Sequence, residues 1–226
     1  MSLFMPRLKL TLFDLDNTLL TGDSDVLWCD FLIKRGILDH QQFSARNADM
    51  EARYKAGTVR IREFSEFYVG TLAGRSVDEW EPLRSEFLEH EIIPRIPQTA
   101  RDLVNKRLDE DDLVAITTAT NRFITELTAR HLGVAHLIAT ETEMIDGVFS
   151  GRTEGQLNMR EGKVVRLHAW LASNGATRSD FEITAYSDSI NDLPLLLAAD
   201  FPVAVNPDEQ LAQWASAGQH AVLNLR

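Results

Sequence analysis

The pattern of apolar and polar positions divides the chain into an N-terminal strand, a helical block, and a longer region of alternating helices and strands. Residues 8–13 alternate apolar positions with Lys9 and Thr11, which predicts a strand with one exposed face rather than a fully buried central strand. The roughly seventy residues that follow have a helical period and no strand pattern. Four helices are expected there: one that begins at Ser24 or Asp25 and ends at Gly36, then 41–55, 59–72 and a helix opened by the capping-box sequence 76–79.

After Pro97 the pattern alternates regularly between helices and strands. The run 113–117 is almost continuously apolar, which is typical of strands in parallel sheets. The remaining expected elements are helices at 98–108, 121–132, 163–172 and 191–199, strands at 137–140, 182–186 and 202–205, and a hairpin at 144–155. This order predicts an α/β fold with a doubly wound parallel sheet. We expect a core domain of residues 1–21 and 96–226, interrupted by a helical domain of residues 22–95.

Polar side chains follow several of the predicted strands at the point where each strand ends. Asp14 and Asp16 follow the first strand, residues 117–120 include three threonines, and residues 187–192 contain two aspartates. Lys163 opens the helix that comes after the hairpin. Taken singly, such residues are more often helix caps or solvated surface. Because ligands bind outside the carboxyl ends of parallel strands, their joint placement indicates a functional site at one sheet edge.

The residue types at these strand ends favour phosphoryl chemistry. A carboxylate can attack phosphorus and form an acyl phosphate once the phosphoryl charge is neutralised. Mg²⁺ does this and prefers carboxylates, a carbonyl and water, so Asp14 and Asp188 are the candidate metal carboxylates. Lys163 and Thr118 are candidates to hold the phosphoryl oxygens. Asp16 is placed to protonate the leaving oxygen and then to activate water.

The amino-acid composition limits the classes of binding partner that are expected. The 226 residues are 44% hydrophobic and carry a formal net charge of -11, which argues against nucleic acid or an anionic membrane as a partner. Cys29 is the single cysteine, so no intrachain disulfide is possible, and a reducing cytoplasm fits. We expect Cys29 to be a buried apolar residue. The longest apolar run, 193–205, contains two prolines and Asp200, so no membrane span is expected. The sequence does not predict an oligomeric state.

The sequence 14–18 (Asp-Leu-Asp-Asn-Thr), Thr118, Lys163 and the sequence 187–192 together resemble the four motifs of the haloacid dehalogenase-like hydrolases. The likeness is greatest to the phosphoserine phosphatase-like branch, of the subfamily IB type. The resemblance implies a Rossmann-like core with an inserted helical C1 cap, and an aspartyl-phosphate intermediate. It also implies the following roles: Asp14 as nucleophile, Asp16 as general acid and base, Mg²⁺ on Asp14, the Asp16 carbonyl and Asp188, Ala119 and Asn191 near the phosphate, and Asp192 supporting the metal site or Lys163.

The resemblance also bears on the substrate. Phosphoserine phosphatases hold the substrate ammonium group with a glutamate nine positions after the nucleophile, and Asp23 stands there. They bind the serine carboxylate with a cap arginine, and counting from Gly57 places Glu66 at or near that position. A shift of one helical turn would instead admit Arg60 or Arg62. An acidic residue there would repel a carboxylate and favour an amine-bearing phosphate ester such as histidinol phosphate.

Three other functions stay open. The enzyme could be a phosphoserine phosphatase, or a phosphotransferase that uses the same intermediate. A non-catalytic binding protein ranks last, since all four motif positions hold their functional residues. In every case the expected partner is a small phosphorylated metabolite.

Aromatic residues of the helical block have two interpretations. Trp28 follows Asp23 and Asp25 by one helical turn, which favours a place in the cap cavity. A place in the cap's own small core is about equally expected. Phe64, Phe67 and Tyr68 form a stripe that is more often core than substrate contact. The acidic run 109–112 is expected to be a solvated turn.

Overall fold

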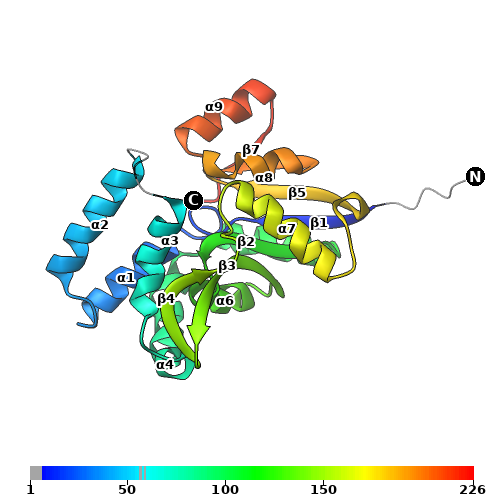
Figure 1. Ribbon diagram of the computed structural model, residues 1–226. Helices are drawn as coiled ribbons and strands as arrows, with labels where there is room; N and C mark the ends of the chain where they lie inside the picture. The colour runs from blue at the N-terminus through cyan, green and yellow to red at the C-terminus, as the bar shows by residue number, and fades with distance from the viewer. Residues whose placement is uncertain (1–6, 56–57, 59) are drawn as a thin grey trace, which may run out of the picture.

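The computed structural model describes residues 7–55, 58 and 60–226, and its centre is a seven-stranded sheet (Figure 1). The strand order is β4-β3-β2-β1-β5-β6-β7, and every neighbouring pair is parallel except β3 and β4, which form an antiparallel hairpin. The strands are β1 Leu8–Phe13, β2 Leu113–Asn121, β3 His136–Ile145, β4 Val148–Glu154, β5 Phe181–Ser187, β6 Phe201–Val205 and β7 Ala221–Leu223. The predicted doubly wound α/β fold is confirmed.

Strand β1 lies in the middle of the sheet, so the prediction of a half-exposed strand is wrong. Leu10 and Leu12 face one hydrophobic cluster and Phe13 faces the other. Thr11 is fully buried, and its hydroxyl donates to Asp112 Oδ2 at 2.8 Å. That hydrogen bond offsets the cost of burying the hydroxyl, which is why a polar residue sits in a central strand. It also shows that Asp112, at the end of the acidic run, is buried rather than solvated.

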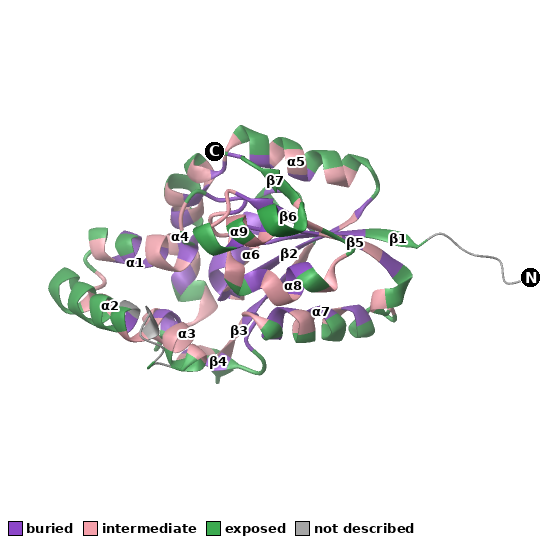
Figure 2. Cartoon of the chain, turned by 90° about the horizontal axis from the view of Figure 1, so that it is seen from above, coloured by how far each residue is buried: buried purple, intermediate pink, exposed green. Residues whose placement is uncertain are grey.

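Helices cover both faces of the sheet. Side chains of α5 and α6 share a cluster with Phe13 and Ile116, whereas side chains of α7, α8 and α9 pack with Leu10 and Leu12. Figure 2 shows α5 on one side of the sheet and α7 and α8 on the other. These helices are α5 Gln98–Asp109, α6 Arg122–His131, α7 Glu161–Ser173, α8 Leu193–Ala198 and α9 Glu209–Gly218, with the short turns η4 Arg178–Asp180 and η5 Ile190–Asp192. The sequence pattern did not predict α9 or β7.

A helical cap connects β1 to α5. It contains α1 Ser24–Lys34, α2 His40–Lys55, α3 Ile61–Val69, η1 Gly70–Leu72, α4 Val77–Phe87, η2 Leu88–Ile92 and η3 Ile93–Arg95. The capping box of Ser76 and Glu79 is present at the start of α4. Asp23, rather than Ser24 or Asp25, caps α1 through its side chain. Val59, where the third helix was expected to begin, lies outside the described residues.

One hydrophobic cluster joins the cap to the core. Trp28 of α1 is buried and packs edge-on against Trp80 and Phe87 of α4, with centroids 5.6 and 5.1 Å away, and against Phe123 of α6 at 6.3 Å. Trp28 is therefore a core residue of the cap. Cys29 beside it is buried as expected, and burial raises the pKa of its thiol. Whereas α1 and α4 pack on α6 and α3 lies beside β4, α2 is the cap helix that stands farthest from the sheet (Figure 1).

No helix within residues 7–55, 58 and 60–226 is both long enough and apolar enough to span a membrane.

Candidate active site

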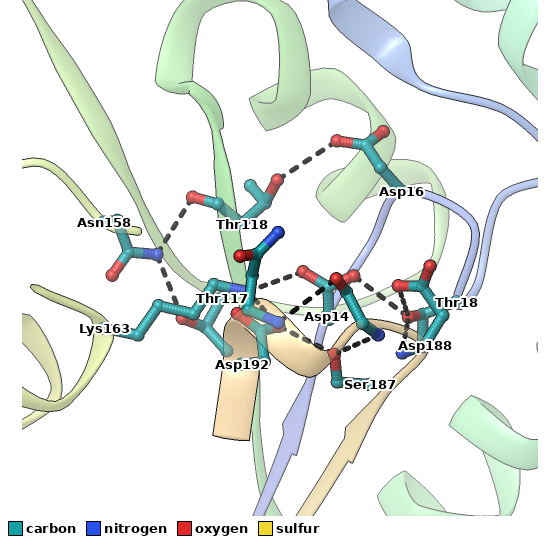
Figure 3. A network of polar contacts seen from close by, with 12 residues as sticks. Asp14, Asp16, Thr18, Thr117, Thr118, Asn158, Lys163, Ser187, Asp188 and Asp192 are labelled. Atoms are coloured by element: carbon teal, nitrogen blue, oxygen red, sulfur yellow. Dashed lines mark hydrogen bonds and ion pairs between the residues drawn. The ribbon is translucent and has the colours of Figure 1, made fainter. Parts of the chain in front are cut away.

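The carboxyl ends of β1 and β5 bring distant parts of the sequence together (Figure 3). Asp14 directly follows β1, and Asp188 directly follows β5. Lys163 reaches the same point from the first turn of α7, and Asp192 reaches it from η5. Adjacent parallel strands end at the same edge, so the placement follows from the order of the sheet.

Lys163 is held between two carboxylates. Its Nζ donates to Asp14 Oδ1 at 2.7 Å and to Asp192 Oδ2 at 2.6 Å, and its side chain is 3% exposed. Burial disfavours the ammonium charge, but Asp14 and Asp192 hold the pKa of Lys163 above its ordinary value. Ser187 Oγ also donates to Asp192 Oδ2, at 2.7 Å. Asp192 therefore acts on Lys163, fixing the ammonium beside Asp14.

Asp14 and Asp188 share a hydroxyl. Thr18 Oγ1 lies 2.9 Å from Asp14 Oδ2 and 3.1 Å from Asp188 Oδ1, and it accepts from the Asp188 N–H at 3.1 Å. Burial, partly offset by Lys163, raises the pKa of Asp14 to about 7. Burial and the charge of Asp14 raise the pKa of Asp188 to about 8. The positive charge of Lys163 therefore does not fully compensate the negative charge of Asp14 and Asp188.

This uncompensated charge fits a divalent cation. Within the described residues no group of three or more His, Cys, Asp or Glu side chains has the arrangement of a metal cluster. Mg²⁺ needs fewer, because it commonly takes one or two carboxylates and completes its shell with water and substrate oxygens. The carboxylates of Asp14 and Asp188, which share the Thr18 hydroxyl, therefore suit Mg²⁺.

Asp16 is anchored to the cap and to β2. Its Oδ1 accepts from the Ser24 N–H at 2.8 Å and from the Ser24 hydroxyl, and its Oδ2 accepts from Thr120 Oγ1 at 2.8 Å. Burial and the nearby charge of Asp23 raise the pKa of Asp16 to about 6. A carboxyl with a raised pKa keeps a proton more readily, which suits a general acid.

Asn158 holds the β2 end of the site. Its Nδ2 donates to the carbonyl oxygens of Thr118 at 2.9 Å and Ile138 at 2.8 Å, and lies 3.0 Å from Thr117 Oγ1. Asn158 is fully buried. Thr118 Oγ1 lies 3.4 Å from Asp16 Oδ2, so the hydroxyl expected to hold phosphate is next to the predicted acid. Asn158 was not predicted as a site residue, because it stands in a loop that carries no motif.

A cavity of about 210 Å³ opens over these residues. Its described lining comes from the strand ends, from the first turn of α1 and from one face of α3. Six of the lining residues are aspartates and one, Lys163, is basic. The lining residues are Asp14, Asp16, Asn17, Asp23, Asp25, Phe64, Ser65, Tyr68, Thr118, Ala119, Thr120, Met159, Lys163, Asp188, Ser189, Asn191 and Asp192.

Comparison with known proteins matches residues 11–197 to the family model described as haloacid dehalogenase-like hydrolase. The chain belongs to this family. A histidinol-phosphatase of Neisseria meningitidis is 38% identical over 220 residues, which cover 96% of this chain and 99% of that protein. A phosphoserine phosphatase of Mycobacterium tuberculosis is 31% identical over 90% of this chain and 66% of its own length. The chain is a phosphatase of the haloacid dehalogenase-like family.

Solved structures share the fold of this chain. A Bordetella pertussis protein of unknown function has a TM-score of 0.94 and 43% identity, with 98% of this chain and 100% of that chain covered. A phosphoserine phosphatase with a phospho-aspartyl intermediate analogue has a TM-score of 0.67 at 16% identity, which shows a shared fold; 98% of this chain and 95% of that chain are covered. The predicted family and branch are confirmed.

In this haloacid dehalogenase-like hydrolase, the predicted residues Asp23, Ala119 and Asn191 line the cavity. Glu66 does not. Its Oε1 accepts from the Thr153 N–H at 3.2 Å and from Thr153 Oγ1 at 3.1 Å, so the side chain faces the β3–β4 hairpin. Counting from Gly57 predicts where Glu66 stands along the helix, but not which part of the protein its face of the helix contacts.

Other cavity residues were not predicted as site residues. Phe64 and Tyr68 line the cavity, although the aromatic stripe was assigned to the core; their spacing of four residues was the available signal. Asp25 and Thr120 also line it. Asp25 was interpreted as a possible helix cap, and Thr120 was counted only as a member of the threonine cluster after a strand, without a role of its own.

Proposed function

We propose that this enzyme is a Mg²⁺-dependent phosphomonoesterase that acts on a small, amine-bearing phosphate ester through an aspartyl phosphate on Asp14. The observation that carries the proposal is the arrangement around Asp14. This carboxylate lies at a strand end beside Lys163, shares Thr18 with Asp188, and faces a cavity that Asp16 also lines.

The first step transfers the phosphoryl group to the protein. An Asp14 carboxylate oxygen attacks phosphorus and forms an acyl phosphate while the bond to the ester oxygen breaks. Lys163 neutralises charge beside Asp14, and the Thr118 hydroxyl donates to a phosphoryl oxygen. Asp16 gives its proton to the departing alkoxide, so the organic product leaves as an alcohol.

The second step restores the enzyme. Asp16, now a carboxylate, takes a proton from water as the water oxygen attacks phosphorus. The bond between phosphorus and the Asp14 oxygen breaks, which releases inorganic phosphate and regenerates the carboxylate. Ser24 and Thr120 hold Asp16 in place in both steps. Mg²⁺, held by Asp14, Asp188 and the Asp16 carbonyl, would supply charge neutralisation for the phosphoryl oxygens.

The charge of the cavity supports an amine-bearing substrate. Asp23 and Asp25 line it, and Lys163 is already paired with Asp14 and Asp192. Burial and the charges of Asp23 and Asp16 raise the pKa of Asp25 well above its ordinary value, so a cation placed there would be favoured.

A substrate carboxylate, by contrast, has no basic partner among the described lining residues except Lys163, which Asp14 and Asp192 already pair. Arg62 points instead to Thr153 and Gly155. The histidinol-phosphatase relative from Neisseria meningitidis supports the same choice. We therefore favour histidinol phosphate over phosphoserine. A cytoplasmic location agrees with the single cysteine, which can form no intrachain disulfide.

The test is a substrate panel measured as released phosphate with Mg²⁺, beside Asp14→Asn as control. We expect histidinol phosphate to be turned over faster than phosphoserine, and the variant to be inactive. Release at equal rates by the variant would contradict the role of Asp14, and faster turnover of phosphoserine would contradict the substrate class. A second candidate, phosphotransfer, is separated by adding an alcohol acceptor and looking for a new phosphate ester.

A further inference from the structure

A polar contact between α3 and the β3–β4 hairpin stands outside the chemistry described above. Two side chains of α3 meet the same threonine of β4. Arg62 donates to Thr153 Oγ1 at 2.6 Å and to the Gly155 carbonyl at 2.7 Å. Glu66 accepts from the Thr153 N–H at 3.2 Å and from its hydroxyl at 3.1 Å. Thr153 thus accepts from one side chain and donates to the other.

The same helix presents a different face to the cavity. Phe64, Ser65 and Tyr68 line the cavity, whereas Arg62 and Glu66, four residues apart, form a separate row toward β4. A helix is stiff over nine residues, so fixing one row fixes the other. The position of the three cavity-lining residues therefore depends on the contact with Thr153.

A second attachment joins the cap to the hairpin at Phe149, through backbone hydrogen bonds rather than side-chain ones. Phe149 is buried, its N–H donates to the Arg75 carbonyl, and its carbonyl accepts from Gly74, both at 2.9 Å. Gly151 comes so close to η1 that a Cβ there would lie 2.9 Å from Ala73 Cβ. This attachment is built from backbone and apolar contacts and cannot exchange its partners for water without loss.

The Thr153 contact can exchange its partners for water more readily. The side chains of Arg62 and Glu66 are 48% and 30% exposed, so water can replace their lost hydrogen bonds at a small net cost. Thr153 is 6% exposed, so its N–H and hydroxyl gain water only when α3 moves away. The cap therefore has one fixed attachment at Phe149 and one releasable attachment at Thr153. Figures 1 and 2 both show α3 lying beside β4 at the rim of the sheet.

We propose that Arg62, Glu66 and Thr153 form a clasp that positions the cavity-lining face of α3 over the substrate's organic part. These are positioning residues, and the assignment rests on the proposed phosphatase function. Release of the clasp lets α3 move about the fixed attachment while the phosphoryl site of Asp14 and Lys163 is left intact. The clasp thus sets KM for substrates that fill the cavity.

The test compares two substrates across four variants. Glu66→Ala and Thr153→Val each remove two of the clasp's hydrogen bonds, and Glu66→Gln keeps an acceptor oxygen for Thr153. Glu63→Ala is the control on the same helix, because the Glu63 carboxylate pairs with Arg53 instead. We expect Glu66→Ala and Thr153→Val to raise KM for histidinol phosphate by about tenfold, equivalent to about 1.4 kcal/mol. The kcat for p-nitrophenyl phosphate should stay near the wild-type value in all four. Glu66→Gln and Glu63→Ala should resemble the wild type with both substrates.

Unchanged KM in Glu66→Ala and Thr153→Val would overturn the clasp, as would an equal loss of kcat with both substrates, which would indicate a folding defect. Hydrogen exchange gives a readout that needs no activity. The amides of α3 should exchange faster in Glu66→Ala than in the wild type and Glu66→Gln, with α4 unchanged. A wild-type protein inactive on all esters would refute the proposed function alone, whereas unchanged exchange in α3 would refute the clasp.

Discussion

Replacing Asp14, the proposed nucleophile, should make the metal-free protein more stable at alkaline pH while it abolishes activity. Asp14 is 6% exposed, and burial raises its pKa from 3.8 to about 7. Between those values the folded state binds more protons than the unfolded state, so stability falls as pH rises. The shift of about 3 pH units, at 1.36 kcal/mol each, corresponds to about 4 kcal/mol lost by pH 8.

Asp14→Asn removes this penalty and keeps the shape of the side chain. Lys163 loses one of its two carboxylate partners but keeps Asp192 at 2.6 Å. The net gain at pH 8 in the presence of EDTA should therefore be smaller, about 1–3 kcal/mol, and it should vanish near pH 4, where Asp14 is protonated. Mg²⁺ should stabilise the wild type at pH 8 and leave the variant almost unaffected, because the variant lacks one metal carboxylate.

Urea unfolding followed by circular dichroism at pH 4 and pH 8, with EDTA or with Mg²⁺, measures all four conditions. A variant that is less stable than the wild type at pH 8 in EDTA would refute the reasoning. So would a gain of equal size at both pH values, since the effect would then not arise from ionisation. Equal Mg²⁺ stabilisation of both proteins would place the metal away from Asp14.

Three further changes test other parts of the site. Lys163→Met leaves two buried carboxylates without their cation, so kcat/KM should fall by at least about 1,000-fold and the free energy of unfolding by about 3 kcal/mol, measured by phosphate release and urea unfolding. Asp25→Asn should lower kcat/KM for histidinol phosphate by about tenfold or more, but not for p-nitrophenyl phosphate, whereas the exposed control Asp30→Asn on the same helix should change neither. Asn158→Leu leaves the Thr118 carbonyl unpaired in a buried place, so thermal and urea unfolding should show a loss of about 2 kcal/mol together with reduced kcat.

The proposed catalytic centre could be predicted from the sequence because the placement of its side chains follows from the order of the sheet. Asp14 and Asp188 stand immediately after strands that are neighbours in the order β2-β1-β5, and parallel neighbours end at one edge. Lys163 belongs to the same set, since a helix start after a strand or hairpin lies near that edge. Once the strands are recognised, no finer detail of packing is needed to bring these three side chains together.

The cap could not be predicted in the same way. Period and capping signals placed α1 and α4 closely, but the direction of each helix face depends on how the cap docks. Glu66 was expected at the substrate and contacts Thr153, whereas Phe64 and Tyr68 were expected in the core and line the cavity. A helical pattern shows which residues share a face but not which segment that face contacts. For Glu66 the contacting residue, Thr153, is 87 residues away in the sequence.

The sequence by itself determined the family, the α/β fold and the meeting of Asp14, Asp188 and Lys163 at one sheet edge, because these depend on residue type and on order along the chain. Only the tertiary structure decided that β1 lies buried in the middle of the sheet, where Thr11 donates a hydrogen bond to Asp112. It also decided that Asp25 joins Asp23 in the cavity and that Glu66 turns to the hairpin. Burial and contact are properties of segments that meet in space, and local periodicity does not encode which segments meet.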